Sequence, residues 1–272
     1  MNKKFLAKIL KGLGYFLMIS FLFFPILWLV LTAFKMPKDA YSTRLFFTPT
    51  FQNFIEIFTP PQSFAPLVLN SVLVAVSTIF IGIPVATMAA YAFSRYQFFG
   101  KSGLLVSVLS TQFIPPVVIV LPFFSLFRTL RLIDTRTSLV ILNLSFVLPF
   151  AIWMIKGFID GIPREIEQAA AVDGCHPFQV LWYVTLPTIM PGVITSAVFA
   201  FIQAWNEFLF ALILTQRRAT TLTVGLMALN TERGILWEQM AATSLIIMVP
   251  IFILSFSIRK YFIAGLTMGA VK

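Results

Sequence analysis

Long apolar stretches separated by short polar segments run through the whole chain. Asp, Glu, Lys and Arg are absent from six of them, which cover residues 12–34, 57–94, 102–127, 137–155, 174–206 and 239–258. An α-helix rises about 1.5 Å per residue, so about 20 apolar residues cross a hydrocarbon core about 30 Å thick. A membrane β-barrel would instead show alternating segments of about ten residues. The pattern therefore predicts an all-α integral membrane protein.

Six transmembrane helices in a single domain, residues 1–272, account for these stretches. We expect the helices over residues 13–33, 69–92, 104–126, 137–157, 190–214 and 240–259. The composition agrees with this fold, because 59% of the residues are hydrophobic and only 11% are charged. In ordinary soluble domains about a quarter of the residues are charged.

Basic residues near the N-terminus predict how the chain is oriented. Lys3, Lys4, Lys8 and Lys11 precede the first apolar stretch, which is longer than the apolar core of about 7–15 residues in a signal peptide. Lys and Arg favour the cytoplasmic side, and the first helix usually dominates the orientation. We therefore expect the N-terminus and, after six spans, the C-terminus to lie in the cytoplasm.

Composition excludes several other classes of function. The net charge of +10 is explained by basic residues that flank spans, and no basic stripe with interleaved aromatic residues indicates nucleic-acid binding. Cys175 and His176 are the only Cys and His, so neither a disulfide within the chain nor a metal site is expected. No nucleophile–base pair is evident, and we predict no catalytic residue.

The segment of residues 35–66 is the longest one expected outside the membrane. It is rich in proline and phenylalanine, which predicts a short interfacial helix and turns at the lipid headgroups. A docking surface for a partner outside the cell is the alternative that this composition leaves open.

A polar, alanine-rich segment, residues 162–187, lies between the expected fourth and fifth spans. Pro163 suits the first turn of a helix, and Glu165 and Glu167 favour its N-terminal end. Gly174 stands where a left-handed residue would end that helix, and residues 178–184 predict a second short helix that ends before Leu186 and Pro187. The segment predicts a compact cytoplasmic hairpin with a small, smooth outer face for a partner protein, or else an ordinary loop helix without a partner.

Several short motifs resemble those of the binding-protein-dependent permeases of ABC importers. Gln168-Ala-Ala-Ala-Val-Asp-Gly174 and Leu186-Pro187 resemble the EAA…G…LP motif of that family. Further similarities lie at Asn70-Ser71 and at residues 90–95, 98–100, 205–208 and 265–272. Together they are similar to the shorter, maltose-permease-type subunit of the sugar-uptake branch, and they imply a type I ABC importer permease fold.

The resemblance assigns the hairpin to ATPase coupling. The residues that it implies are Glu167, Gln168, Ala169, Ala170, Asp173, Gly174, Leu186 and Pro187. Gln168 stands where the motif has glutamate, so an ion pair at that position is lost, and we expect the neighbouring Glu167 to supply the carboxylate. Residues 269–272 would reach toward the ATPase dimer.

The resemblance also implies the partners of the chain. They are a second permease subunit in a heterodimer, an ATP-binding cassette ATPase dimer and an extracytoplasmic solute-binding protein, within the plasma (inner) membrane of a prokaryote. The chain itself binds no cofactor, because a phosphate loop ending at Gly100, Lys101 and Ser102 would need glycine where Arg95 stands. ATP with Mg²⁺ would be used by the partner ATPase.

Glu207 is the only carboxylate predicted deep within a span. A charge at the bilayer centre costs about 2.5–3.5 kcal/mol on insertion scales, so it normally faces a cavity or a partner. Gln203 and Asn206 adjoin it, and Asn143 and Gln112 are weaker candidates in the fourth and third spans. These side chains would line a substrate path for a sugar, or they would form structural hydrogen bonds between helices.

The function that these observations favour is that of a permease subunit in an ATP-driven importer. Its solute would be a sugar or a related polyol or glycerol phosphate. An ion-coupled secondary transporter is one alternative, but it would need several ionisable groups within the membrane. A membrane scaffold that transports nothing is the other. Co-purification of an ATPase and a second permease would distinguish the first function from both alternatives.

Overall fold

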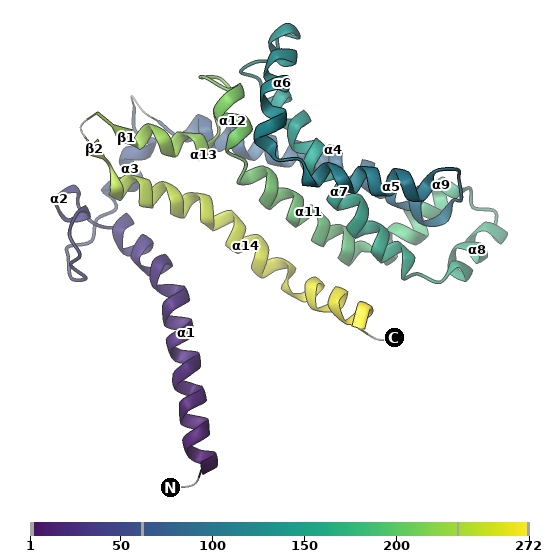
Figure 1. Ribbon diagram of the computed structural model, residues 1–272, viewed down its shortest axis with the longest axis horizontal. Helices are drawn as coiled ribbons and strands as arrows, with labels where there is room; N and C mark the ends of the chain where they lie inside the picture. Colours follow the sequence, from purple (N-terminus) through teal and green to yellow (C-terminus); the bar gives the residue numbers. More distant parts are fainter. Residues whose placement is uncertain (1–2, 61–62, 233, 271–272) are drawn as a thin grey trace. The chain divides into compact units, whose positions relative to one another are not determined.

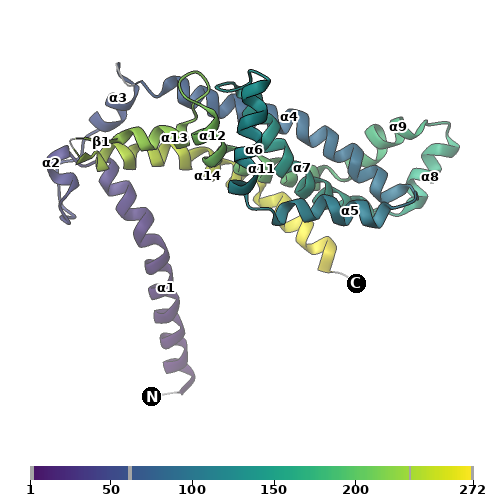
Figure 2. The same cartoon turned by 45° about the horizontal axis from the view of Figure 1, so that its top comes forward.

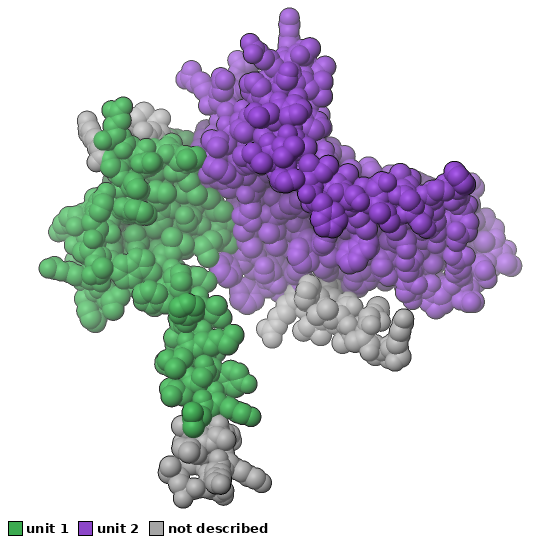
Figure 3. Space-filling model, in the orientation of Figure 1, with its two compact units in different colours: residues 1–65, 226–249 green, residues 66–225, 250–272 purple. Residues whose placement is uncertain are grey.

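The computed structural model describes the backbone of residues 3–60, 63–232 and 234–270, and the side chains of residues 10–60, 63–232 and 234–258. The chain forms two compact units (Figure 3): residues 1–65 with 226–249, and residues 66–225 with 250–272. The side chains of Lys3, Lys4, Lys8, Arg259 and Lys260, and the tail over residues 271–272, lie outside the described residues.

The first unit contains a long helix, several short elements and the start of the last helix (Figure 1). Its elements are α1 (Lys3–Ala33), α2 (Pro37–Ala40), α3 (Gln52–Phe58), the 3₁₀ turn η3 (Leu226–Leu229), the antiparallel strands β1 (Asn230–Thr231) and β2 (Gly234–Ile235), and the first part of α14 (Trp237–Ala270). The short helices α2 and α3 agree with the short helix and turns predicted for residues 35–66.

Two polar side chains anchor the turn that follows α1. The Asn53 amide donates to the carbonyl oxygens of Ala33 and Lys35, each at 2.8 Å, and thereby satisfies acceptors that a helix end leaves free. The Lys35 ammonium is fully buried, donates to the carbonyl of Ser42 at 2.8 Å and lies 4.4 Å from the centre of the Trp28 ring. A cation at this position is held by a ring and a carbonyl in place of a carboxylate.

The second unit contains the central helices and the hairpin (Figures 1 and 2). Its elements are α4 (Ala65–Arg95), α5 (Lys101–Ser110), η1 (Thr111–Phe113), α6 (Pro116–Thr129), α7 (Arg136–Asp160), α8 (Arg164–Val172), α9 (Pro177–Gln179), the π-helix η2 (Val180–Thr185), α10 (Leu186–Thr188), α11 (Met190–Trp205), α12 (Leu209–Leu214) and α13 (Leu222–Gly225).

The core of this unit lies where α4, α7 and α11 pack together. Ala90, Ile155 and Ile159 are fully buried there. At Gly192, in α11, an added Cβ would lie 2.3 Å from the Phe158 ring of α7. Glycine therefore allows these two helices to approach closely, as small residues do between membrane helices.

Among the residues that the structure describes, four helices are long and apolar enough to cross a membrane. Two bent helix pairs bring the number of spans to six if each pair is one span. The four are Leu10–Ala33, Ala65–Arg95, Arg136–Asp160 and Trp237–Ile258. The pairs are Lys101–Phe113 with Pro116–Thr129, bent by 95°, and Pro177–Thr188 with Met190–Trp205, bent by 82°.

The structure differs from the prediction in the third and fifth spans, which were expected to be continuous over residues 104–126 and 190–214. The third is interrupted at Pro115 and Pro116, because proline has no N–H to donate and disfavours helical backbone in the residue before it. The fifth ends at Trp205, and the chain resumes as α12 at Leu209.

Candidate functional site

The first arm of the hairpin is α8, and its end is closed by backbone hydrogen bonds. Gly174 has φ +88°, which confirms the left-handed residue predicted there. The N–H of Cys175 donates to the carbonyl of Ala170 at 3.0 Å, and the N–H of Gly174 donates to that of Ala171 at 3.1 Å. These two bonds form a complete Schellman motif. Backbone hydrogen bonds and the left-handed conformation of Gly174 therefore determine the turn between the two arms.

The second arm is longer than predicted. His176 begins it as a capping residue, with its side chain accepting from the N–H of Phe178 and its own N–H donating to Gln179 at 2.8 Å. Helical turns then run from Pro177 through η2 to Thr188, instead of ending before Leu186. Pro187 does not stop them: it is the second residue of α10, which follows η2 directly.

Most of the predicted coupling residues lie on the outer face of the hairpin. Gln168, Ala169, Asp173, Gly174 and Pro187 are exposed, whereas Ala170 and Leu186 are half-buried. Leu186 packs against the core cluster around Ile155, so it anchors the hairpin.

Apolar side chains are exposed on the same segment. They are Ile166, Val172, Phe178 and Tyr183, with exposed fractions of 46%, 87%, 57% and 76%. Small residues and exposed apolar side chains together form a surface that a partner protein could cover.

Glu167 is buried, in contrast to the surface carboxylate expected beside Gln168. It is the one buried residue of α8. Its Oε2 accepts from Nε of Arg95 at 2.7 Å, and its Oε1 accepts from the Thr185 hydroxyl at 2.8 Å. Adjacent residues of a helix point about 100° apart, so when Gln168 faces outward Glu167 can face the core. The structure thus corrects the expectation that Glu167 replaces the lost surface charge.

Arg95, the last residue of α4, is a member of this site that we did not select from the sequence. Besides Glu167 it contacts the turn between α7 and α8, where its Nη2 donates to the carbonyl of Ile162 at 3.1 Å. The signal in the sequence that could have identified Arg95 was its position at the end of the motif over residues 90–95. That motif indicates a family resemblance but not a partner for the guanidinium.

Glu207 lies at the break between α11 and α12. Its two carboxylate oxygens accept from the N–H groups of Phe210 at 2.6 Å and Ala211 at 3.0 Å, and its own carbonyl accepts from the Thr223 hydroxyl at 2.7 Å. A carboxylate at this place satisfies N–H groups that the start of a helix leaves free. Of the two roles open for Glu207, this geometry favours the structural one.

The other predicted path residues lie on different elements. Gln203 and Asn206 are exposed at the end of α11. Because that helix ends at Trp205, Glu207 does not lie on the same helix face as Gln203. Asn143 is buried and donates to the carbonyl of Leu139 in its own helix at 2.9 Å. Gln112 is exposed and donates to the carbonyl of Phe146 at 2.7 Å.

A second polar cluster, which the sequence did not predict, holds the loop over residues 216–219. The Asp134 carboxylate accepts from the N–H groups of all four loop residues at 3.0–3.3 Å. Burial disfavours the charged form, but these donors outweigh it and lower the pKa of Asp134 below its ordinary value. The Asn70 amide donates to the carbonyls of Arg218 and Thr220, each at 2.9 Å. Asn70 of the Asn70-Ser71 motif thus stabilises the end of this loop through hydrogen bonds to its backbone.

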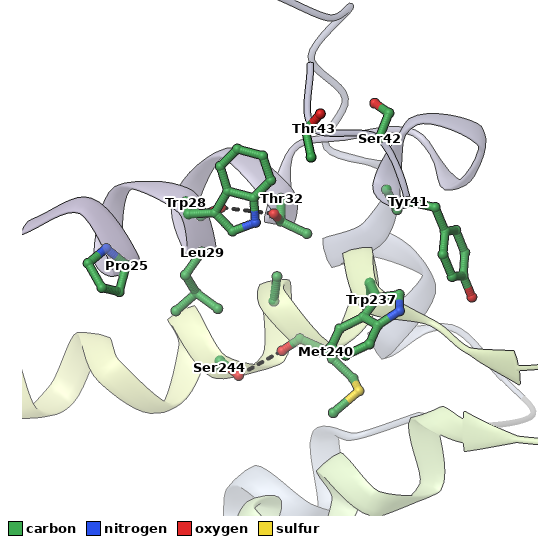
Figure 4. Close-up of a pocket in the computed structure, with 12 residues that line it drawn as sticks. Pro25, Trp28, Leu29, Thr32, Tyr41, Ser42, Thr43, Trp237, Met240 and Ser244 are labelled. Atoms are coloured by element: carbon green, nitrogen blue, oxygen red, sulfur yellow. Dashed lines mark hydrogen bonds between the residues drawn. The ribbon is translucent and has the colours of Figure 1, made fainter. Parts of the chain in front are cut away.

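Each of the two units has a cavity among its described residues. One of about 730 Å³ lies beside the hairpin and is lined by residues that include Trp153, Phe158 and Ile166. The other, of about 530 Å³, lies in the first unit and is shown in Figure 4. Its walls are mainly apolar and include Trp28, Leu29 and Met240. The hydroxyls of Thr32 and Ser244 each donate to a carbonyl of their own helix.

Comparisons with known proteins agree on one family. The family model for "binding-protein-dependent transport system inner membrane component" matches residues 82–267. The chain is 32% identical to the diacetylchitobiose uptake system permease protein DasC of Streptomyces coelicolor, over 92% of each chain. It is 29% identical to the trehalose/maltose transport system permease protein MalG of Thermococcus litoralis, over 100% of this chain and 99% of MalG.

The fold is also similar to that of a solved structure. A chain in the crystal structure of a bacterial ABC transporter involved in import of the acidic polysaccharide alginate superposes with a TM-score of 0.81. The match covers 96% of this chain and 99% of that chain at 19% sequence identity. At this identity the similarity concerns the fold alone.

Proposed function

The chain belongs to the family of binding-protein-dependent transport system inner membrane components, and on this premise we propose that it is the permease subunit of an ATP-driven importer for a sugar. The observation that carries the proposal is the family match over residues 82–267, which includes the whole hairpin. DasC and MalG, which match nearly the full length of this chain, are named for the uptake of sugars. Hydrolysis of ATP takes place on a partner ATPase, and this subunit is not an enzyme.

The proposed complex contains a second permease subunit, an ATPase dimer and an extracytoplasmic solute-binding protein. The outer face of the hairpin, with Gln168, Ala169, Ala170, Asp173 and Gly174, contacts the ATPase on the cytoplasmic side. Exposed apolar side chains on this face support the assignment, since burial against a partner would remove them from water. Both termini lie in the cytoplasm.

Transport proceeds by alternating access. ATP closes the ATPase dimer, the hairpins of both permeases move with it, and the path opens outward to receive solute from the docked binding protein. Within this chain the exposed amides of Gln203 and Asn206 line the path. Glu207 fixes the break where α12 begins.

Purification in mild detergent followed by reconstitution tests the proposal. We expect an ATPase and a second permease to co-purify, and labelled sugar to accumulate in proteoliposomes only with ATP inside and the binding protein outside. Screening ligands on that binding protein identifies the solute. Recovery of this chain alone, or uptake driven by an ion gradient without ATP, would reject the assignment in favour of a scaffold or a secondary transporter.

A further inference from the structure

We propose that the buried Arg95–Glu167 ion pair is the mechanical link through which the hairpin moves α4. The inference rests on the proposed function and adds two positioning residues to it. Each side chain of the pair is only 10% exposed, and their atoms lie 2.7 Å apart. The pair joins residues separated by 72 positions in the chain.

The Glu167 carboxylate joins α8 to two other elements of its unit by hydrogen bonds. Glu167 is the one buried residue among the nine of α8, and the apolar Ile166 and Val172 are exposed. Beyond its packing beside η2 in the second arm, α8 buries no apolar side chain completely. Force applied to the outer face of α8 therefore reaches α4 through Glu167, and it reaches the second arm through the packing of α8 beside η2.

Arg95 and Glu167 connect three elements at one point. Arg95 ends α4 and donates both to Glu167 and to the carbonyl of Ile162 in the turn before α8. Thr185, in the second arm, donates to the other oxygen of Glu167. The planar guanidinium forms directional hydrogen bonds with fixed geometry, so the two arms and the end of α4 move together.

The neighbouring charges do not replace this link. Asp160 accepts from the Ser94 hydroxyl at 2.6 Å and forms an ion pair with Lys156 of the same helix. Among the described side chains, these two ion pairs are the only salt bridges of the chain, and only the first of them includes a residue of α8. Removal of Arg95 therefore leaves Glu167 without a cation.

Purified complexes of wild type, Arg95→Gln and Glu167→Gln, assembled with the binding protein and ATPase, provide the test. We expect both variants to retain the ATPase and its basal activity. Stimulation of ATP hydrolysis by loaded binding protein, and solute uptake per ATP, should fall by roughly fivefold or more, the lower end of allosteric coupling factors. Lys101→Gln is the matched control: Lys101 donates to the carbonyl of Tyr96, just after the end of α4, and forms its bond outside the Arg95–Glu167 pair, so coupling should be unchanged.

A double variant covers the case in which a lone buried charge prevents folding. Arg95→Met with Glu167→Met removes both charges, and apolar replacement of a buried pair is often tolerated. We expect this variant to insert, to retain the ATPase and to be uncoupled. Normal stimulation in the double variant, or loss of the ATPase from any variant that inserts, would overturn the link. Absence of an ATPase from the wild-type complex would instead reject the proposed function.

Discussion

At Gly174 the backbone has φ +88°, a conformation that costs a residue with a Cβ about 1–2 kcal/mol. No atom lies within 4 Å of the position that a Cβ would occupy, so the penalty is conformational and not steric. Asparagine adopts this conformation more readily than other residues with side chains. The hairpin turn therefore depends on backbone freedom at one residue.

We predict that Gly174→Val reduces uptake and destabilises the turn, and that Gly174→Asn retains most of the activity. The physical reason is the different cost of left-handed backbone in the two residues, since both have free space around them. Uptake by reconstituted complexes and limited proteolysis of the hairpin measure the difference. Equal activity of the two variants would show that the left-handed turn is not needed.

Glu207 allows a second prediction for a single residue. Glu207→Ala removes the acceptor for two N–H groups of α12, and loss of a helix cap costs about 0.5–2 kcal/mol. We expect a lower Tm for Glu207→Ala and a smaller loss for Glu207→Gln, which keeps one acceptor. Gln203→Ala, at an exposed position, should leave the Tm unchanged and raise KM for the solute. A higher KM with an unchanged Tm in Glu207→Ala would favour the path-lining role.

Packing of α7 against α11 provides a prediction for a pair of helices. Gly192→Ala places a Cβ 2.3 Å from the Phe158 ring, and overpacking of this kind costs about 1–3 kcal/mol. Gly157→Ala in α7 is the matched control, because no atom lies within 4 Å of its added Cβ. Thermal unfolding in detergent should separate the two variants, and the Phe158→Leu change should partly restore Gly192→Ala. Equal Tm values for both glycine variants would contradict this packing.

The loop over residues 216–219 provides a prediction about pH. The folded state lowers the pKa of Asp134 below its ordinary value of 3.8, so the charged carboxylate stabilises the loop at pH values above that number. This stabilisation is lost as the pH falls through the lowered pKa. We therefore expect the loop to open more readily in acid, and Asp134→Asn to do the same at neutral pH. Limited proteolysis at the loop measures the opening. An unchanged rate of cleavage in Asp134→Asn would contradict the role of the Asp134 carboxylate in holding the loop.

The topology of the whole molecule depends on whether each bent helix pair is one span. With six spans, Arg131 lies outside and Ala169 in the cytoplasm, whereas with four spans the hairpin lies on the opposite side. In a Cys175→Ser background, we predict that Arg131→Cys reacts with a membrane-impermeant thiol reagent in intact cells. Ala169→Cys should react only after the membrane is permeabilised. The reverse pattern would reject six spans and, with them, contact between the hairpin and a cytoplasmic ATPase.

Several features that depend on neighbouring residues could be predicted from the sequence. Membrane-crossing length follows from uninterrupted apolar stretches, and the turn at Gly174 follows from a helix-forming segment that ends in glycine. The interruption at Pro115 and Pro116 was also encoded locally, but hydropathy alone does not distinguish a bent span from a straight one. The family was indicated by the short motifs, because their spacing survives in the chain.

Only the tertiary structure decided what the charged side chains do. Sequence places Glu167 next to Gln168, but it does not show that Arg95, far away in the chain, lies opposite it. Asp134 likewise gains its role from a loop more than 80 residues away. An apolar stretch carries its tendency to form a helix in its own residues. A buried charge, in contrast, is stabilised by whichever donors or acceptors the packed helices bring to it, and that choice arises only when the chain folds.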